Sequence, residues 1–276
     1  MPRIDAHQHF WKFDSVRDNW ITDDMSVIQK DFLPVDLHPL LQKNKFDGCV
    51  VVQSDQSEGE NIFQLINAEE NDFIKGIVGW VDLQSELVEE RLEHYQSFKK
   101  IKGFRHVLQG ESDRALMLRP SFKRGISLLN KYDFTFDILI FPDQLPYSSE
   151  LVKAFPDQPF VIDHIAKPDI KNKNISEWKN DMEIIAQYEN VYCKISGMIT
   201  EADKNRSKED FTPYMDVVIK SFGTKRIMFG SDWPVCLLAA SYDEVVNITQ
   251  EYFSSFSQNE QQLFFGENAS TFYKLS

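Results

Sequence analysis

The sequence predicts one (β/α)8 barrel, a TIM barrel, formed by the whole chain, residues 1–276. Apolar runs rich in β-branched residues recur eight times along the chain, and stretches with helical periodicity separate them. No glycine-rich phosphate loop follows the first run, which favours a closed barrel over an open doubly wound sheet. The length of the chain and its hydrophobic content of 42% suit one large core.

The eight apolar runs are the predicted strands. They cover residues 3–9, 48–54, 74–82, 101–108, 134–141, 160–167, 191–198 and 227–234. Their spacing is close to the roughly 30 residues that a strand, a loop, a helix and a return loop require. Hairpin strands would recur about every 8–12 residues. We therefore expect parallel strands connected through helices.

The stretches between the runs contain apolar residues that would share one helical face. These faces are Ile62, Leu65 and Ile66; Val88, Leu92 and Tyr95; Phe122, Ile126 and Leu129; Trp178, Met182 and Ile185; and Met215, Val218, Ile219 and Phe222. Gly223 is expected to end the last of these helices. Residues 258–273 predict one further C-terminal helix. Residues 10–35 show little periodicity, and a loop of this length is often a lid or a binding loop.

Charge and cysteine content narrow the class of protein. The formal net charge of −13 disfavours a nucleic acid or an anionic membrane as partner. Three scattered cysteines, Cys49, Cys193 and Cys236, indicate a reducing compartment without a disulfide framework. The N-terminus lacks a secretory signal, and no apolar run reaches the ~20 residues of a membrane span. We expect a soluble cytoplasmic protein.

The C-terminal ends of the strands form the active site in a barrel of this type. The polar and aromatic residues at those ends are His7, His9, Gln53, Asp55, Trp80, Asp82, Arg105, His106, Asp137, Asp163, His164, Lys194, Ser196, Asp232 and Trp233. His7 and His9 point the same way because strand side chains alternate. By the same rule Asp163 is expected to face away from His164. Lys194 faces either inward as an amine or outward as a surface residue.

Short motifs in a fixed order extend along nearly the whole chain. They are IDAHQHFW at 4–11, VVQ at 51–53, GWVDL at 79–83, GFRHVLQGE at 103–111, DHIAKP at 163–168, CKISGM at 193–198 and FGSDWPVC at 229–236. With these motifs the chain resembles the amidohydrolase (metal-dependent hydrolase) superfamily. Within it, the chain is similar to the branch of L-fuconolactonase- and L-rhamnonolactonase-like sugar-acid lactonases.

The resemblance implies hydrolysis of a sugar-derived aldonolactone, with water activated by Asp232 as the base. The residues fit such a reaction, which needs a base, an electrophile for the carbonyl oxygen and an acid for the departing ring alkoxide. His7, His9 and His164 are the other expected catalytic residues. The expected substrate-binding residues are Arg105, His106, Gln53, Trp80, Trp11 and Trp233, with Gln109 as a further amide and Trp11 or Trp20 closing over the ring. Core packing remains the alternative for the tryptophans, and a structural ion pair remains the alternative for Arg105.

The expected cofactor is at most one divalent metal ion, zinc before others, on His7, His9 and Asp232, with or without His164. Catalysis without a metal is the alternative, with the histidines and Arg105 acting directly on the oxyanion. Binuclear relatives carry a lysine or glutamate ligand on strand four and a histidine on strand five. This chain has Arg105 and His106 on strand four and no histidine on strand five. No organic cofactor is expected.

Three other functions remain open. A non-oxidative decarboxylase of the same superfamily would use the same histidines and aspartate, and a different lactone, such as a dicarboxylate lactone, would use the same mechanism. A barrel that only binds sugar acids would have no need of Asp232 as a base. Gln53, Gln109 and the tryptophans favour a polyhydroxylated neutral ring over the substrate of a decarboxylase, which would need firm anchoring of the departing carboxylate. The expected partner is a small-molecule lactone.

Overall fold

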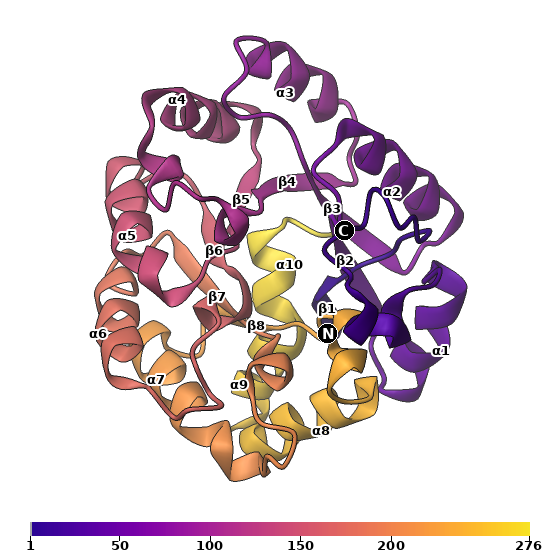
Figure 1. The fold of residues 1–276 in the computed structure, drawn as a ribbon, viewed down its shortest axis with the longest axis vertical. Helices are drawn as coiled ribbons and strands as arrows, with labels where there is room; N and C mark the ends of the chain where they lie inside the picture. Colours follow the sequence, from indigo (N-terminus) through magenta and orange to yellow (C-terminus); the bar gives the residue numbers. More distant parts are fainter. Residues whose placement is uncertain (1) are drawn as a thin grey trace.

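The computed structural model describes residues 2–276 and contains eight parallel strands in the order β1 to β8 around a barrel (Figure 1). The strands are β1 Ile4–Gln8, β2 Gly48–Val52, β3 Ile74–Gly79, β4 Ile101–His106, β5 Thr135–Ile138, β6 Phe160–Ile162, β7 Val191–Ile195 and β8 Ile227–Phe229. Each lies within one of the predicted runs. The barrel closes between its first and last strands, where Gln8 bridges Trp233 and the His9 amide donates to the Trp233 carbonyl at 2.7 Å. The (β/α)8 barrel is confirmed.

Helices surround the sheet, as Figure 1 shows. They are α1 Pro34–Lys43, α2 Glu58–Glu70, α3 Val88–Gln96, α4 Pro120–Leu129, α5 Leu145–Ala154, α6 Ser176–Ile185, α7 Thr212–Phe222, α8 Tyr242–Phe253, α9 Gln258–Gln262 and α10 Asn268–Phe272. The apolar faces predicted for α3, α4 and α6 are buried, and that of α7 is buried except for the half-buried Ile219. Gly223 ends α7 at a positive φ of 67°, a conformation that favours glycine. Among residues 2–276, no helix combines the length and apolarity needed to cross a bilayer.

The face predicted for α2 is wrong. Ile62 and Ile66 are 59% and 51% exposed, and Leu65 is only half-buried. The amide of Gln64 instead points inward and donates to the carbonyl oxygen of Phe10 at 2.8 Å. Hydrogen bonds to the ends of neighbouring strands therefore outweigh the apolar periodicity of this helix. The buried face of α2 consists of Glu60, Asn61, Gln64, Asn67 and Ala68.

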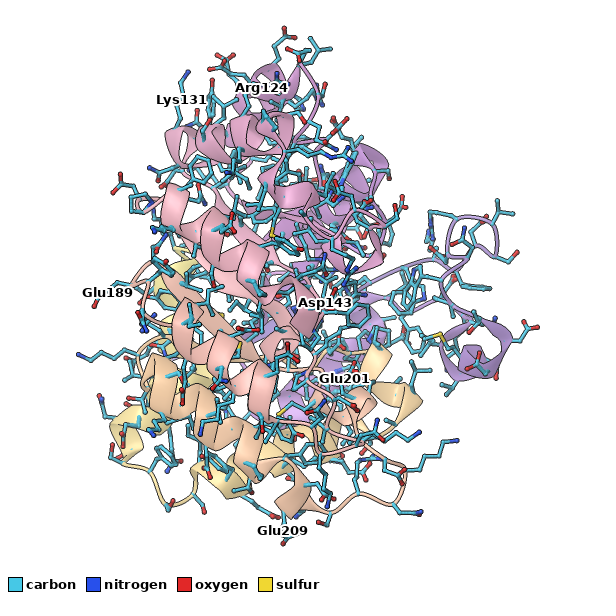
Figure 2. All side chains as sticks on the ribbon, turned by 60° about the vertical axis from the view of Figure 1, so that its left-hand side comes forward. Arg124, Lys131, Asp143, Glu189, Glu201 and Glu209 are labelled. Atoms are coloured by element: carbon cyan, nitrogen blue, oxygen red, sulfur yellow. The ribbon has the colours of Figure 1, made fainter. Side chains whose placement is uncertain are left out.

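The first loop connects β1 to α1 and contains the short 3-10 segment Asp23–Ile28. It stands away from the barrel at the right of Figure 2. Trp11 anchors the base of the loop, because its backbone pairs with Phe32 and its indole NH donates to the Lys30 carbonyl at 2.9 Å. Trp20 lies on the loop with its ring edge-on to Trp11 at 5.9 Å, and it is 40% exposed.

The lower part of the barrel interior is apolar and is closed by α10. Figure 1 shows α10 lying across the barrel. It follows α9 and the π-helical turn Leu263–Glu267, so the predicted helical segment 258–273 is confirmed. The strand residues and the α10 residues that form this cluster are Ile4, Ala6, Val50, Val52, Val78, Val161, Met228, Ala269, Phe272 and Tyr273.

Candidate active site

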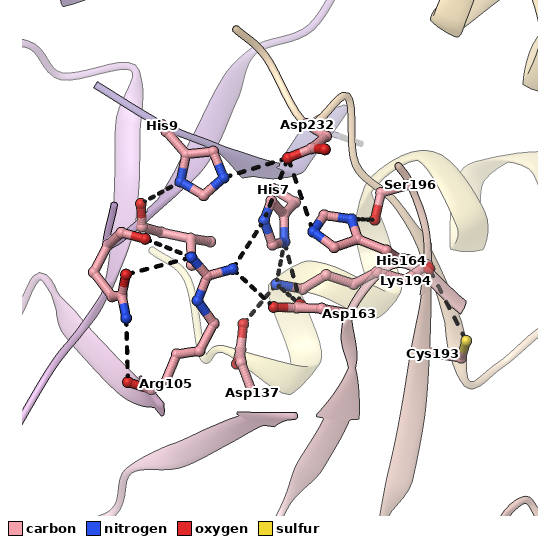
Figure 3. A network of polar contacts seen from close by, with 12 residues as sticks. His7, His9, Arg105, Asp137, Asp163, His164, Cys193, Lys194, Ser196 and Asp232 are labelled. Carbon is pink, nitrogen blue, oxygen red and sulfur yellow. Dashed lines mark hydrogen bonds and ion pairs between the residues drawn. The ribbon is translucent and has the colours of Figure 1, made fainter. Parts of the chain in front are cut away.

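Three imidazoles converge on the carboxylate of Asp232, which follows β8 (Figure 3). The Nε2 atom of His9 lies 3.3 Å from Asp232 Oδ1, and those of His7 and His164 each lie 3.8 Å from the same oxygen. All four side chains are almost fully buried. The two β1 histidines lie on one side of the chain, as strand alternation predicts. The structure thus brings the four expected catalytic residues together.

The other ring nitrogen of each histidine is already engaged. A contact at Nδ1 fixes the orientation of the ring and turns Nε2 toward the centre of the site. The Nδ1 partners are the carbonyl of Val52 for His9 at 2.7 Å, the hydroxyl of Ser196 for His164 at 2.9 Å, and the carboxylate of Asp163 for His7 at 3.2 Å. Close packing also fixes the ring of His164, because a Cβ on Gly197 would lie 2.6 Å from its Nδ1.

This arrangement fits a divalent metal ion. Among residues 2–276, the buried Oδ1 of Asp232 accepts no hydrogen bond, which is costly for a carboxylate oxygen unless a cation or a proton donor reaches it. Imidazole nitrogens with one carboxylate oxygen are a donor set typical of zinc and similar ions. The ligand atoms of His7, His9 and Asp232 all lie within 4.8 Å of one another, and those of His7, Asp163 and His164 do so as well.

Burial and neighbouring charges set the protonation states of the site. Burial lowers the pKa of His7 and of His164 well below the usual value for histidine, so both rings are neutral. Burial alone would raise the pKa of Asp232, but His164 and the contact with His9 more than offset it and the pKa is lowered. Asp232 is therefore an anion that faces the neutral rings of His7 and His164.

Asp163 lies inside this cluster, and the expectation that it faces away from His164 is wrong. Its carboxylate lies 3.2 Å from His7 Nδ1, 3.1 Å from Arg105 Nη1 and 3.0 Å from Lys194 Nζ. Strand alternation fails here because β6 ends at Ile162 and the chain then enters a turn. Burial would raise the pKa of Asp163, but Lys194 and His7 hold it well below its usual range.

A buried chain of charges continues from Asp163 toward α10. The ammonium of Lys194 is fully buried and lies 2.6 Å from Asp137 and 3.1 Å from His7 Nδ1. The hydroxyl of Tyr273, just after α10, donates to Asp137 at 2.8 Å. Burial raises the pKa of Asp137 to about 6, although Lys194 opposes this shift. Lys194 therefore points inward, where the sequence left both directions open.

A cavity of about 310 Å³ opens above this cluster. It is lined by His9, Trp20, Ser54, Asp55, Gln56, Arg105, Val107, Gln109, Leu139, His164, Lys167, Asp232 and Val235. The Oε1 atom of Gln109 is buried and, within residues 2–276, accepts no hydrogen bond, so it is available to a ligand hydroxyl. Both the first loop, through Trp20, and the ends of six strands, β1, β2, β4, β5, β6 and β8, contribute to the wall.

Among the residues expected to contact the substrate, Gln109 and Trp20 line the cavity, and so does Arg105. Its guanidinium also lies 3.3 Å from His7 Nε2 and donates to the carbonyl oxygen of Gln53. The side chain of Gln53 is fully buried behind Arg105, so it can act on a ligand only through that residue.

The other four expected binding residues lie away from the cavity. His106 follows the inward Arg105 on β4 and therefore faces outward, 2.9 Å from Glu111 and edge-on to Phe122. Trp11 and Trp233 both pack against Phe32 in the core. Trp80 is half-buried beside α2, where Asn61 binds its backbone. These positions give no support to direct substrate contact.

Sequence reasoning missed Lys167, Ser54 and Gln56. Ser54 and Gln56 lie beyond the end of β2, and their loop is held in place by hydrogen bonds of Ser54 to Glu60 on the polar face of α2. A search that extended each strand end by three residues would have found both. Lys167 enters the cavity through an unusual backbone turn after β6, and its position at the end of the predicted run 160–167 and within the motif DHIAKP is the signal that could have found it.

Comparisons with known proteins agree with this geometry. The family model described as amidohydrolase matches residues 4–275. The chain is 36% identical to an L-fucono-1,5-lactonase from Burkholderia multivorans, over 99% of this chain and 96% of that protein. It is 26% identical to an L-rhamnono-gamma-lactonase from Scheffersomyces stipitis, over 56% of this chain and 51% of that one.

A solved structure gives the same result. An amidohydrolase from Burkholderia multivorans with bound zinc superposes on the whole chain with a TM-score of 0.96, at 35% identity and with full coverage of both chains. The same protein with bound HEPES superposes equally well. The match of the family model over nearly all residues and the full-length relatives lead to one conclusion: the chain belongs to the amidohydrolase family and is a hydrolase.

Proposed function

We propose that the protein hydrolyses a sugar-derived aldonolactone, similar to L-fuconolactone, with water as the nucleophile. The convergence of three imidazoles on Oδ1 of Asp232, which accepts no hydrogen bond within residues 2–276, carries this proposal. A buried carboxylate held as an anion is a base for a water molecule placed beside it. The names of the relatives support a lactone as the substrate.

Asp232 removes one proton from the attacking water. The lactone carbonyl lies over His7, His9 and His164, and negative charge develops on its oxygen as the water adds. The guanidinium of Arg105, which lines the cavity beside His7, provides fixed positive charge near that oxygen. Collapse of the tetrahedral adduct breaks the ring C–O bond and releases a hydroxy acid.

A single divalent ion, zinc before others, fits His7, His9 and Asp232, with His164 close enough to contribute. When bound, such an ion would polarise the carbonyl as a Lewis acid. A second ion is disfavoured because Lys194 and Arg105 already place two positive charges on Asp163. We therefore expect one metal ion per chain at saturation, measured by elemental analysis.

The cavity suits a polyhydroxylated ring. Its polar lining includes Gln56, Gln109 and Asp55, groups that bind hydroxyls. A site that hydrogen-bonds several hydroxyls rejects analogues without them, since its own buried polar groups are then left unpaired. We expect much higher kcat/KM for five- or six-membered aldonolactones of the L-fucono type than for butyrolactone or valerolactone.

A panel of aldonolactones, plain lactones and one dicarboxylate lactone, assayed by proton release with and without a chelator, tests the proposal. Parallel detection of CO2 from aromatic acids tests the decarboxylase alternative. Equal efficiency on hydroxylated and plain lactones would rule out a sugar-acid substrate. CO2 release without lactone hydrolysis would replace the proposal. Loss of activity with chelator, restored by zinc, would assign the metal a catalytic role.

A further inference from the structure

The turn that follows β6 has an unusual backbone. Four consecutive residues without a glycine, His164, Ile165, Ala166 and Lys167, have φ values between 48° and 58°, in the left-handed region. For an L-residue this conformation costs roughly 1–2 kcal/mol. Strain of this kind persists only where the surroundings enforce it, and it often occurs at functional sites.

The surroundings do enforce it. Ile165 and Ala166 are fully buried in the core, and the indole NH of Trp178 on α6 donates to the Ile165 carbonyl at 2.8 Å. The Lys167 amide donates to the His164 carbonyl at 2.8 Å and closes the turn. Residues three apart in such a tight turn lie on the same side of it. Both His164 and Lys167 accordingly line the cavity.

Among the described residues, Lys167 is the only lysine that lines the cavity. Its Nζ lies 5.7 Å from the centre of the Phe141 ring, and within residues 2–276 no carboxylate lies close enough to form an ion pair with it. Its charge nevertheless acts on Asp232, adding to the effects of His164 and His9 that hold the pKa of Asp232 down. Arg105, the other cation of the cavity, is bound to Asp163 and Gln53.

We propose that Lys167 is the catalytic acid that protonates the departing ring oxygen of the lactone; this rests on the proposed lactonase function. Asp232 takes one proton from water as its oxygen bonds to the carbonyl carbon. When the ring C–O bond breaks, the bonding pair goes to the ring oxygen, which takes a proton from the Lys167 ammonium. Solvent reprotonates the amine, Asp232 releases its proton, and the new carboxylic acid ionises. One proton per turnover is released to the solution.

A matched pair of substrates tests this role. The ring oxygen of an aldonolactone leaves as an alkoxide and needs an acid. The thiolactone of the same acid keeps every hydroxyl, but its ring sulfur leaves as a thiolate, whose conjugate thiol has a pKa of roughly 8.5. We expect Lys167→Met to lower kcat at least ~100-fold on the lactone, the lower range for loss of a general acid, and only a few-fold on the thiolactone. Lys167→Arg keeps the charge but donates poorly, so it should restore KM and leave kcat low.

Two controls separate this role from a structural one. Lys171→Met, at an exposed lysine four residues further on, should leave both rates unchanged. Asp232→Asn should slow both substrates, because both require attack by water. Methionine is unbranched like lysine, so the strained backbone tolerates it equally and Tm should stay within a few degrees.

The outcomes separate the two proposals. An equal loss on lactone and thiolactone, or no loss on the lactone, would overturn the assignment of Lys167 while leaving the lactonase proposal intact. A wild-type protein that hydrolyses neither substrate, nor any aldonolactone of the panel, would instead overturn the lactonase proposal, and the role of Lys167 with it.

Discussion

The upper and lower parts of the barrel interior are built from the same strands but differ in chemistry. The lower part is an apolar cluster of strand residues closed by Phe272 and its neighbours on α10. The upper part consists of buried charges and imidazoles, among them Arg105, Asp163, Lys194 and Asp232. Apolar burial stabilises the fold by roughly 25 cal/mol per Å². Buried charges contribute little net stability, and each becomes costly when its partner is removed.

This difference indicates that the lower part of the strands serves stability and the upper part serves function. Apart from Tyr273, whose hydroxyl donates to Asp137, the residues of the lower cluster pack in an apolar environment, so we expect their substitution to change stability and leave the chemistry intact. In the upper part, a residue that faces the cavity should affect the rate, and one that holds its neighbours in place should affect both. The following predictions test this division.

Lys194→Met should have the largest effect on stability. It leaves Asp137 and Asp163 buried without their shared ammonium, which is expected to cost about 3–5 kcal/mol of unfolding free energy. Urea denaturation measures this loss. The double variant Lys194→Met/Asp137→Leu should recover part of it. A Lys194→Met protein as stable as the wild type would show that the buried ammonium is not needed to balance the two carboxylates.

Phe272→Ala should lower the unfolding free energy by about 3 kcal/mol, since it opens a cavity in the lower cluster. Below the melting transition, kcat should stay within a few-fold of wild type because no upper residue loses a contact. A loss of kcat comparable to that of a cavity residue would contradict the separation of the two parts.

Asp232→Asn should lower kcat at least ~100-fold, equivalent to about 2.7 kcal/mol in activation free energy. The amide keeps the shape of the side chain and removes its basic oxygen. Steady-state kinetics on a lactone accepted by the wild type give this value, and the thermal midpoint should change little. Near wild-type turnover of this variant would contradict the assignment of Asp232 as the base.

Tyr273→Phe should have the smallest effect, a loss of about 1.5 kcal/mol, because it removes only a hydroxyl that donates to Asp137. It tests a direct link between the segment that closes the barrel and the buried charges. In the background of Lys194→Met/Asp137→Leu the same substitution should cost much less, since no carboxylate remains to accept the bond. Equal costs in the two backgrounds would show that the hydroxyl stabilises something else.

The sequence predicted the parts of the site that obey strand alternation. His7 and His9 lie two apart on β1, so their convergence follows from the strand alone, and Asp232 follows the apolar run of β8. Arg105 on β4 was identified in the same way. His106 shows that lying at a strand end is not enough to place a residue in the site. Its neighbour Arg105 faces inward, so His106 faces outward.

The features that were not predicted depend on tertiary contacts. Asp163 and Lys167 are placed by a left-handed turn that begins where β6 stops, five residues before the end of the predicted run. The direction of Lys194 is ambiguous because strands of a parallel barrel are buried on both faces. Tyr273 meets Asp137 across 136 residues of sequence, so this contact depends on where α10 docks.

The position of α10 has a consequence for biosynthesis. All eight strands precede it in the chain, so the lower end of the barrel stays open until residues 268–273 have left the ribosome and docked. A nascent chain that has formed its strands still exposes Val50, Val161 and Met228 to water and to other chains. Exposed apolar surface of this kind is what chaperones bind and what drives aggregation of incomplete folds. Docking of this short segment therefore also marks the point at which the nascent protein buries its last apolar surface and loses its tendency to aggregate.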